Sequence, residues 1–385
     1  MYWIALKMLV EDKMRFSGIV LSLAFATIIM SQQSAIFVGL MHRTYGAITD
    51  TPQPDIWVMN KSVKLIDDII GMRGTELFRV RSVQGVLWAV PLFKGLVSAT
   101  LPNGQTQSCV IIGIDEETFI GSPMTMLNGD IRDLRSVDGI IMNKVGAETK
   151  MAFSRNPTKP REPMHTGDVF EINDLRARVV GICDITRTFQ SQPVIYTTYK
   201  RALAYAPFQR KQLTFILVKS DGTISPEDLC IRITKNTGLA AYTQHGFKAK
   251  TVWYYIKNTG IPVSFGLAVL LGLLIGALIA GQFFYNFIMS NLKYFGVFSA
   301  MGASRYLLAR MAILQAAFVA FLGWGMGSGV VGLIGILSHQ TELSFFYAWY
   351  IFIGSCVTIF LICSASLLIS LRKIFTIELG SLFKQ

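Results

Sequence analysis

Four long apolar segments restrict this chain to folds that can place them in a membrane. Each has a core of more than 20 residues without Asp, Glu, Lys or Arg, and a helix needs about 20 apolar residues to cross a bilayer. Only 16% of the residues are charged and the mean hydropathy is +0.45, whereas soluble domains are about one quarter charged. A wholly soluble protein is excluded, and we predict four transmembrane helices at residues 17–41, 259–290, 309–337 and 345–371.

Lysine and arginine are distributed unevenly around these segments. Three precede the first apolar core, three lie between the second and third, and three follow the fourth, whereas the loop at 338–344 has none. Cytoplasmic segments carry the excess of Lys and Arg, so we expect both termini in the cytoplasm and residues 42–258 outside. The remaining pieces are then an amphipathic helix (1–16), a cytoplasmic segment (291–308), a short periplasmic loop (338–344) and a cytoplasmic tail (372–385).

The external block alternates strand-like and helix-like pieces. Short apolar runs at 55–59, 85–91, 95–100, 108–114, 167–172, 178–182 and 213–219 predict strands, and Asn103-Gly104 and Asn173-Asp174 predict hairpin turns. Ser225 followed by Pro226 predicts the start of a helix that runs to about residue 236. The predicted fold class is therefore an α-helical membrane protein with four transmembrane helices, plus a large extracytoplasmic mixed α+β domain between helices 1 and 2.

The sequence contains none of the common catalytic or metal-binding motifs. It has no G-x-x-x-x-G-K-[ST], no H-E-x-x-H and no G-x-S-x-G, and its four histidines are scattered. The external block holds 27 basic and 20 acidic residues, which indicates an ordinary solvated surface and not a nucleic-acid site. We predict no catalytic residue, no metal ligand and no nucleic-acid partner. Cys109, Cys183 and Cys230 allow at most one disulfide in this block, and their spacing does not select a pair.

Glycines recur at helical spacing in the second and third apolar segments. Residues four apart lie on one face of a helix, and small residues there permit close helix approach. We therefore predict a helix-packing role for Gly272, Gly276, Gly323, Gly325, Gly327 and Gly329. The sequence does not decide between packing within one chain and packing in a dimer. The second segment is long enough either to project beyond the bilayer or to tilt within it.

The segment after the second apolar stretch has an apolar stripe. Leu292, Phe295, Phe298 and Met301 recur every three residues, Gly302 can end a short helix, and Ser304 can cap the next one. Such a ridge suits docking into a groove of another protein, or lying flat on lipid.

This segment resembles the signature of FtsX-like ABC transporter permeases. The match runs through Lys293, Phe295, Gly296, Ala300, Met301, Gly302, Ala303 and Ser304. The chain departs from the signature at Tyr294, where the family has Glu, and at Ser299, where it has a basic residue. The layout of one span, a large external domain and three further spans is also similar to the family. Residues 54–59, Pro-Asp-Ile-Trp-Val-Met, look like the permeases of DevBCA-type exporters, so the resemblance is nearest to DevC-like members of the MacB type.

The resemblance implies a non-catalytic permease subunit in the bacterial inner membrane. It implies two copies of the permease, two separate ABC ATPase subunits that bind ATP and Mg²⁺, a periplasmic membrane-fusion adaptor and an outer-membrane channel. No cofactor is expected on this chain. Coupling to the ATPase is expected at Lys293, Phe295, Gly296, Phe298, Met301, Gly302, Ala303 and Ser304, braced by residues 1–16.

One other function fits the same sequence, and a further alternative lacks the residues it would need. The external domain of an FtsX-like regulator activates a cell-wall hydrolase or acts as a sensor without moving cargo. A membrane-anchored enzyme would need a catalytic cluster in the external block, and the sequence offers none.

Overall fold

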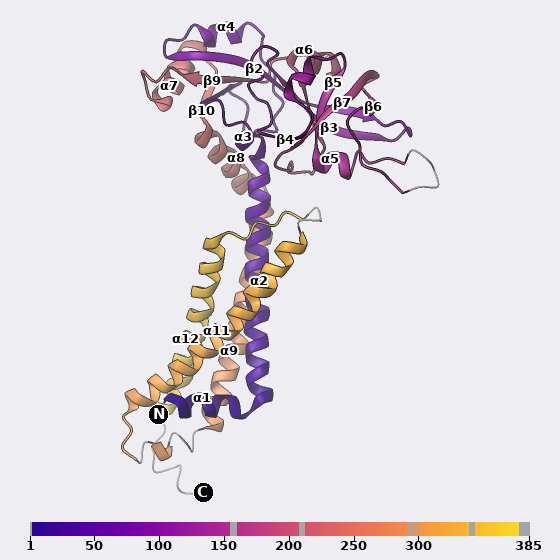
Figure 1. Cartoon of the computed structure of the whole chain (residues 1–385). Helices are drawn as coiled ribbons and strands as arrows, with labels where there is room; N and C mark the ends of the chain where they lie inside the picture. Colours follow the sequence, from indigo (N-terminus) through magenta and orange to yellow (C-terminus); the bar gives the residue numbers. More distant parts are fainter. Residues whose placement is uncertain are drawn as a thin grey trace. The chain divides into compact units, whose positions relative to one another are not determined.

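The computed structural model describes residues 2–154, 160–207, 212–291, 294, 296–298, 301–338 and 343–376 (Figure 1). The chain divides into a helical unit, residues 1–40 with 260–385, and an α+β unit, residues 41–259. The division falls inside the helix α2 (Lys13–Thr44).

The helical unit consists mainly of long apolar helices. Four of them have the length and composition needed to cross a membrane, as predicted. They are α2, α9 (Ile261–Ser290), α11 (Arg305–Ser338) and α12 (Trp349–Thr376). A shorter helix, α1 (Tyr2–Glu11), precedes them.

The helix expected over residues 1–16 is divided at Asp12. Its carboxylate accepts a hydrogen bond of 3.1 Å from the backbone N–H of Arg15, so Asp12 is the N-cap of α2. α1 packs against α11, and Leu9 joins the bundle core with Leu23, Phe284 and Val319. Because α2 starts with its own cap, its first turn is already helical four residues before the predicted span begins.

The α+β unit is built on an extended sheet. Within the described residues, the strands follow the order β10-β1-β9-β2-β3-β8-β5-β7-β4, and β6 pairs with β2 and β7. Their bounds are β1 Ile56–Met59, β2 Val86–Thr100, β3 Thr106–Ile114, β4 Thr125–Asn128, β5 Gly139–Asn143, β6 Val169–Ile172, β7 Leu175–Asp184, β8 Val194–Thr198, β9 Phe215–Ser220 and β10 Ala240–Thr243.

Short helices cover this sheet. They are α3 (Gly46–Thr49), α4 (Glu76–Arg81), α5 (Lys144–Glu148), α6 (Tyr199–Tyr205), α7 (Pro226–Thr237), α8 (Gln244–Asn258) and the 3-10 helix η1 (Ile131–Arg135). The predicted start of α7 is confirmed, because the Ser225 hydroxyl accepts a hydrogen bond from the N–H of Asp228 at 3.1 Å. The mixed α+β class of this unit is thus as predicted.

The strand β2 is longer than the sequence pattern indicated. Two separate strands were expected at 85–91 and 95–100, but β2 runs through both. Residues 86–92 pair with β9 and residues 93–100 pair with β3, both antiparallel. Lys94 lies just after the point where β2 exchanges one neighbour for the other, so a charged residue inside an apolar run occupies the middle of the sheet.

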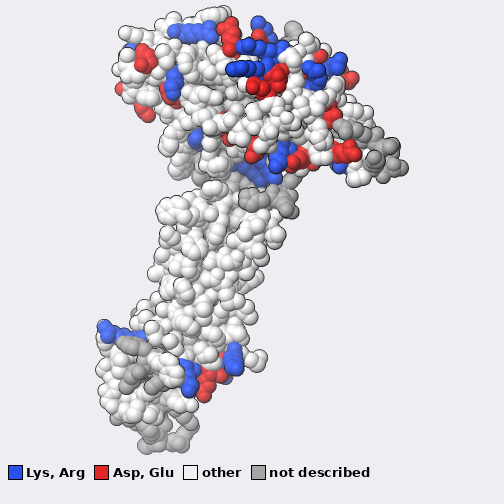
Figure 2. Space-filling model, in the orientation of Figure 1, with Lys and Arg blue, Asp and Glu red and all other residues white. Residues whose placement is uncertain are grey.

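The two predicted hairpin turns differ in type. Asn173 and Asp174, between β6 and β7, both have positive φ angles of 47° and 66°, as a two-residue I′ turn requires. The turn at Asn103-Gly104 is wider, because Leu101 donates to Gln105 across it. The α+β surface carries both signs of charge, whereas the visible side of the helical unit is uncharged along most of its length (Figure 2).

Candidate functional site

The described residues of the predicted coupling segment are helical at 294 and 296–298, and a tight turn follows them. The N–H of Ala303 donates to the carbonyl of Phe298 at 3.0 Å, and Gly302 has φ +90°. This 6→1 bond over a left-handed glycine is the Schellman ending of a helix. The Ser304 hydroxyl then accepts from the N–H of Leu307 at 3.2 Å and caps α11. Gly296 lies in the short helix, whereas Lys293, Phe295 and Ala300 lie outside the described residues.

Some apolar side chains of this segment pack against α11, and others are exposed. Phe298 and Ala303 pack against Leu308 and Met311 of α11, so Phe298 holds the turn together. Met301 is 64% exposed. Two further residues, Tyr294 and Val297, are 54% and 50% exposed and precede Met301 by seven and four positions. The exposed stripe is therefore Tyr294, Val297 and Met301.

The sequence pattern, read at a spacing of three residues, placed Phe298 and Met301 on the same apolar stripe. A helix has 3.6 residues per turn, and spacings of three and four would have identified Tyr294 and Val297 instead. The predicted stripe, at a spacing of three, left out Val297, and Tyr294 was named only as a departure from the family signature.

Four of the six predicted packing glycines lie directly against α2. A Cβ added at Gly272 would come within 3.0 Å of Ile29, and one at Gly276 within 3.0 Å of Ala26. On α11, a Cβ at Gly323 would lie 2.6 Å from the Cβ of Leu23, and one at Gly327 would lie 2.6 Å from the carbonyl oxygen of Ala24. Contacts under 3.0 Å leave no room for a methyl group, so glycine is required at Gly323 and Gly327 for this helix packing.

Gly325 and Gly329 face elsewhere. A Cβ at either position would meet no described atom within 4 Å. Two residues along a helix correspond to a rotation of about 200°, so alternate glycines fall on opposite faces. Within one chain, α2 is held by the pairs Gly272–Gly276 and Gly323–Gly327.

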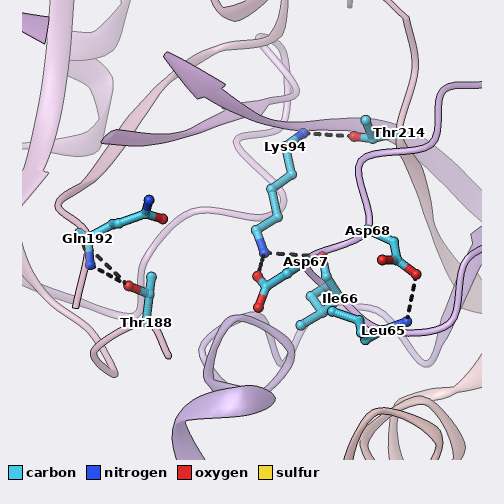
Figure 3. Close-up of polar contacts among 8 residues, drawn as sticks. All are labelled: Leu65, Ile66, Asp67, Asp68, Lys94, Thr188, Gln192 and Thr214. Atoms are coloured by element: carbon cyan, nitrogen blue, oxygen red, sulfur yellow. Dashed lines mark hydrogen bonds and ion pairs between the residues drawn. The ribbon is translucent and has the colours of Figure 1, made fainter. Parts of the chain in front are cut away.

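The α+β unit contains a polar centre that the sequence did not reveal. The Lys94 side chain is only 5% exposed and forms an ion pair with Asp67. Its ammonium group also donates to the carbonyl of Ile66 at 3.1 Å, and its backbone N–H donates to the Thr214 hydroxyl at 2.7 Å. Figure 3 shows the lysine side chain reaching from the strand to the loop that carries Asp67.

A cavity of about 180 Å³ lies beside this lysine. Its wall includes Thr188 and Gln192, which exchange hydrogen bonds of 2.8 and 3.2 Å (Figure 3), and Tyr255 of α8. Burial raises the pKa of Tyr255 to about 12, and the negative charges of Asp67 and Asp68 act in the same direction. The phenol therefore stays neutral at physiological pH.

The chemistry available in the α+β unit is limited. In the part of the chain that the structure describes, no group of three His, Cys, Asp or Glu side chains could hold a metal ion. Cys109, Cys183 and Cys230 are free and buried, so the disulfide that the sequence allowed is not formed. The ammonium group of Lys94 is engaged by a carboxylate and a carbonyl, and it ties the loop before α4 to β2 where that strand changes partners.

Comparisons with known proteins identify the C-terminal part of the chain. Residues 266–379 match the family model of the FtsX-like permease C-terminal domain. A search for relatives among curated proteins finds no match.

Several solved structures are similar at low identity, including the following two. One is the extracellular domain of the noncanonic ABC-type transporter YknZ from Gram-positive bacteria, with 12% identity, coverage of 49% of this chain and 98% of that chain, and a TM-score of 0.35. The other is the periplasmic region of MacB from Actinobacillus actinomycetemcomitans, with 14% identity, coverage of 55% and 96%, and a TM-score of 0.37. The family match covers α9 from residue 266 onward, α11 and α12, and this part of the chain is similar to the C-terminal domain of FtsX-like permeases.

Proposed function

We propose that this chain is the permease subunit of an ABC transporter of the MacB/FtsX type. The observation that carries the proposal is the FtsX-like match over residues 266–379, which includes α9 from residue 266 onward, the coupling segment, α11 and α12. The four helices long and apolar enough to cross a membrane agree with it. Within the proposed class, residues 54–59 favour a DevC-like exporter.

The proposed placement is the bacterial inner membrane, with both termini in the cytoplasm. The distribution of Lys and Arg supports it, because these residues gather on the segments that would then be cytoplasmic. The coupling segment would face the cytoplasm, and the α+β unit would lie in the periplasm.

In this proposal the chain transmits motion and hydrolyses nothing. It has no phosphate-binding loop, so ATP and Mg²⁺ would bind to two separate ATPase subunits. The exposed side chains of Tyr294, Val297 and Met301 supply an apolar surface for such a partner. The close glycine contacts of α9 and α11 with α2 support transmission, since helices packed at this distance shift together.

The complete assembly would contain a second copy of the chain, a periplasmic adaptor and an outer-membrane channel. The α+β unit would act on the exported substrate outside the membrane, with no substrate path between the spans.

Affinity purification of the full chain from solubilised membranes tests the proposal. We expect an ABC ATPase in the purified complex at about one copy per permease, identified by mass spectrometry, together with an adaptor protein. Recovery of the ATPase with a cell-wall hydrolase would favour the regulatory function over export. Purification of the chain without any ATPase contradicts the proposed class.

A further inference from the structure

The helical unit contains a groove that the proposed coupling does not use. It lies between the first turns of α2 and the last turns of α9 and has a volume of about 810 Å³. Apolar side chains form much of its wall, among them Ile19, Leu278, Phe283 and Phe287.

Polar residues line the same groove in a regular pattern. Gln282, Asn286 and Ser290 follow one another at intervals of four on α9, so they share one face of that helix. Gln282 and Asn286 are exposed, and neither side-chain amide has a hydrogen-bond partner among the described residues. Each amide carries donors and an acceptor, so the groove presents unpaired hydrogen-bonding groups on a helix that is otherwise strongly apolar.

Arg15 closes one end of the groove and joins the two helices. Its Nε forms an ion pair with Asp12 at 2.8 Å, and its Nη1 donates to the Ser290 hydroxyl at 3.0 Å. These contacts leave the donors of Nη2 without a partner in the described part of the chain. A guanidinium group in this state suits a phosphate, which accepts parallel N–H bonds.

The polarity of the groove changes along α9. Leu278 and Ile279 line it toward the middle of the helix. The polar lining residues of α9 and Arg15 all lie toward its end, beside Phe287 and Met289. α9 has 30 residues and is therefore about 45 Å long, whereas the apolar core of a bilayer is about 30 Å thick. If α9 enters the core near its first residue, residues 282–290 reach the level of the headgroups. A lipid in the bilayer changes polarity in the same direction, from an apolar acyl chain in the core to a polar headgroup at the surface.

We propose that this groove binds a phospholipid of the cytoplasmic leaflet. The phosphate lies on Arg15, the glycerol and ester oxygens lie on Gln282 and Asn286, and an acyl chain follows Leu278 and Ile279. The inference rests on the proposed membrane insertion. We favour a lipid over a second protein helix because one lipid molecule supplies both the phosphate for Arg15 and the ester oxygens for the two amides.

Lipid titration of the purified full chain tests this site. The chain is delipidated in detergent and titrated with dioleoylphosphatidylglycerol, and the bound lipid is counted by native mass spectrometry. Arg15→Ala removes a charge-assisted hydrogen bond and is expected to weaken the tightest binding event about tenfold, which corresponds to about 1.4 kcal/mol. Gln282→Leu with Asn286→Leu is expected to weaken it by a similar factor.

Matched variants outside the groove serve as controls. Gln33→Leu removes an amide from α2, and Lys13→Ala removes a charge near Arg15, but neither residue lines the groove. Both controls are expected to bind lipid like the wild type. Arg15→Lys keeps the charge but loses the planar fork, so it should fall between the wild type and Arg15→Ala.

Three outcomes overturn the proposal. In the first, the groove variants bind the lipid as tightly as the controls do. In the second, the groove variants no longer associate with a second copy of the chain but still bind the lipid. In the third, the wild type binds no phosphatidylglycerol. The titration contains no ATPase, so a failed lipid site leaves the ATPase purification unaffected. A failed ATPase partnership likewise leaves the lipid result unaffected.

Discussion

The ammonium group of Lys94 on β2 and the carboxylate of Asp67 in the loop before α4 form an ion pair inside the α+β unit. The two partners are unequally buried, because the lysine side chain is 5% exposed and the aspartate side chain is 41% exposed. Removing Asp67 therefore lowers the stability of the fold by a different amount from removing Lys94. Water can solvate an unpaired Asp67, but it reaches an unpaired Lys94 poorly.

We predict that Asp67→Asn destabilises the protein more than Lys94→Met. Leaving a buried charge without its partner costs about 3 kcal/mol, and the introduced amide would recover part of this through a hydrogen bond. Lys94→Met removes the buried charge with a side chain of similar length. Thermal unfolding of the full chain in detergent, followed with a thiol-reactive dye, measures both midpoints. The pair Lys200–Glu116, whose lysine side chain is 85% exposed, provides the control. Water solvates this lysine when its partner is lost, so Glu116→Gln should shift the midpoint little. Equal shifts for Asp67→Asn and Lys94→Met would contradict this account.

The two faces of α11 should respond differently to a single methyl group. Gly323→Ala places a Cβ 2.6 Å from that of Leu23, and overpacking of this kind costs about 1–3 kcal/mol. Gly325→Ala meets no described atom within 4 Å and gains up to about 1 kcal/mol of helix propensity. The thermal midpoint should fall for the first variant and stay level or rise for the second. A lower thermal midpoint for Gly325→Ala, with an unchanged midpoint for Gly323→Ala, would mean that the face of α11 with Gly325 is the closely packed one.

The buried thiols of the α+β unit should be unreactive in the folded protein. Burial raises the pKa of Cys109, Cys183 and Cys230 to about 12 each. The thiolate is the reactive form, and at pH 8 a thiol with this pKa is about one part in ten thousand ionised. In a Cys356→Ala/Cys363→Ala background, an aromatic disulfide reagent should label none of the three until denaturant is added. Ser82→Cys, at an exposed position, should be labelled at once. Rapid labelling of the parent before unfolding would show that the thiols are accessible.

The sequence predicted individual helices and strands better than it predicted which of them pair or pack together. Hydrophobic runs identified the four apolar helices, and Ser225 identified the start of α7, because length and capping are local properties. The continuity of β2 could not be predicted, since its residues 86–92 and 93–100 take their partners from distant strands. Lys94 was missed for the same reason, because its partner Asp67 comes from a loop of no recognisable pattern.

The candidate sites show a similar division. The alternation of glycines on α11 was visible in the sequence, but which of them contact α2 depends on the rotation of the helix. In the coupling segment the residue types pointed to an apolar ridge. Spacing of three instead of 3.6 residues selected Phe298, which packs inward, and passed over Val297, which is exposed.

The coupling role of Val297 and Met301 is the central claim, and one comparison tests it directly. The variant Val297→Asp/Met301→Asp is purified from membranes next to the wild type and to Val137→Asp, a control at a 78% exposed position of the α+β unit. The measurement is the amount of ABC ATPase recovered per permease. Charges in a desolvated apolar contact cost several kcal/mol, so we predict that recovery falls at least about tenfold in the double variant, with unchanged permease in the membrane and unchanged recovery for Val137→Asp. Full ATPase recovery with the double variant would contradict the account.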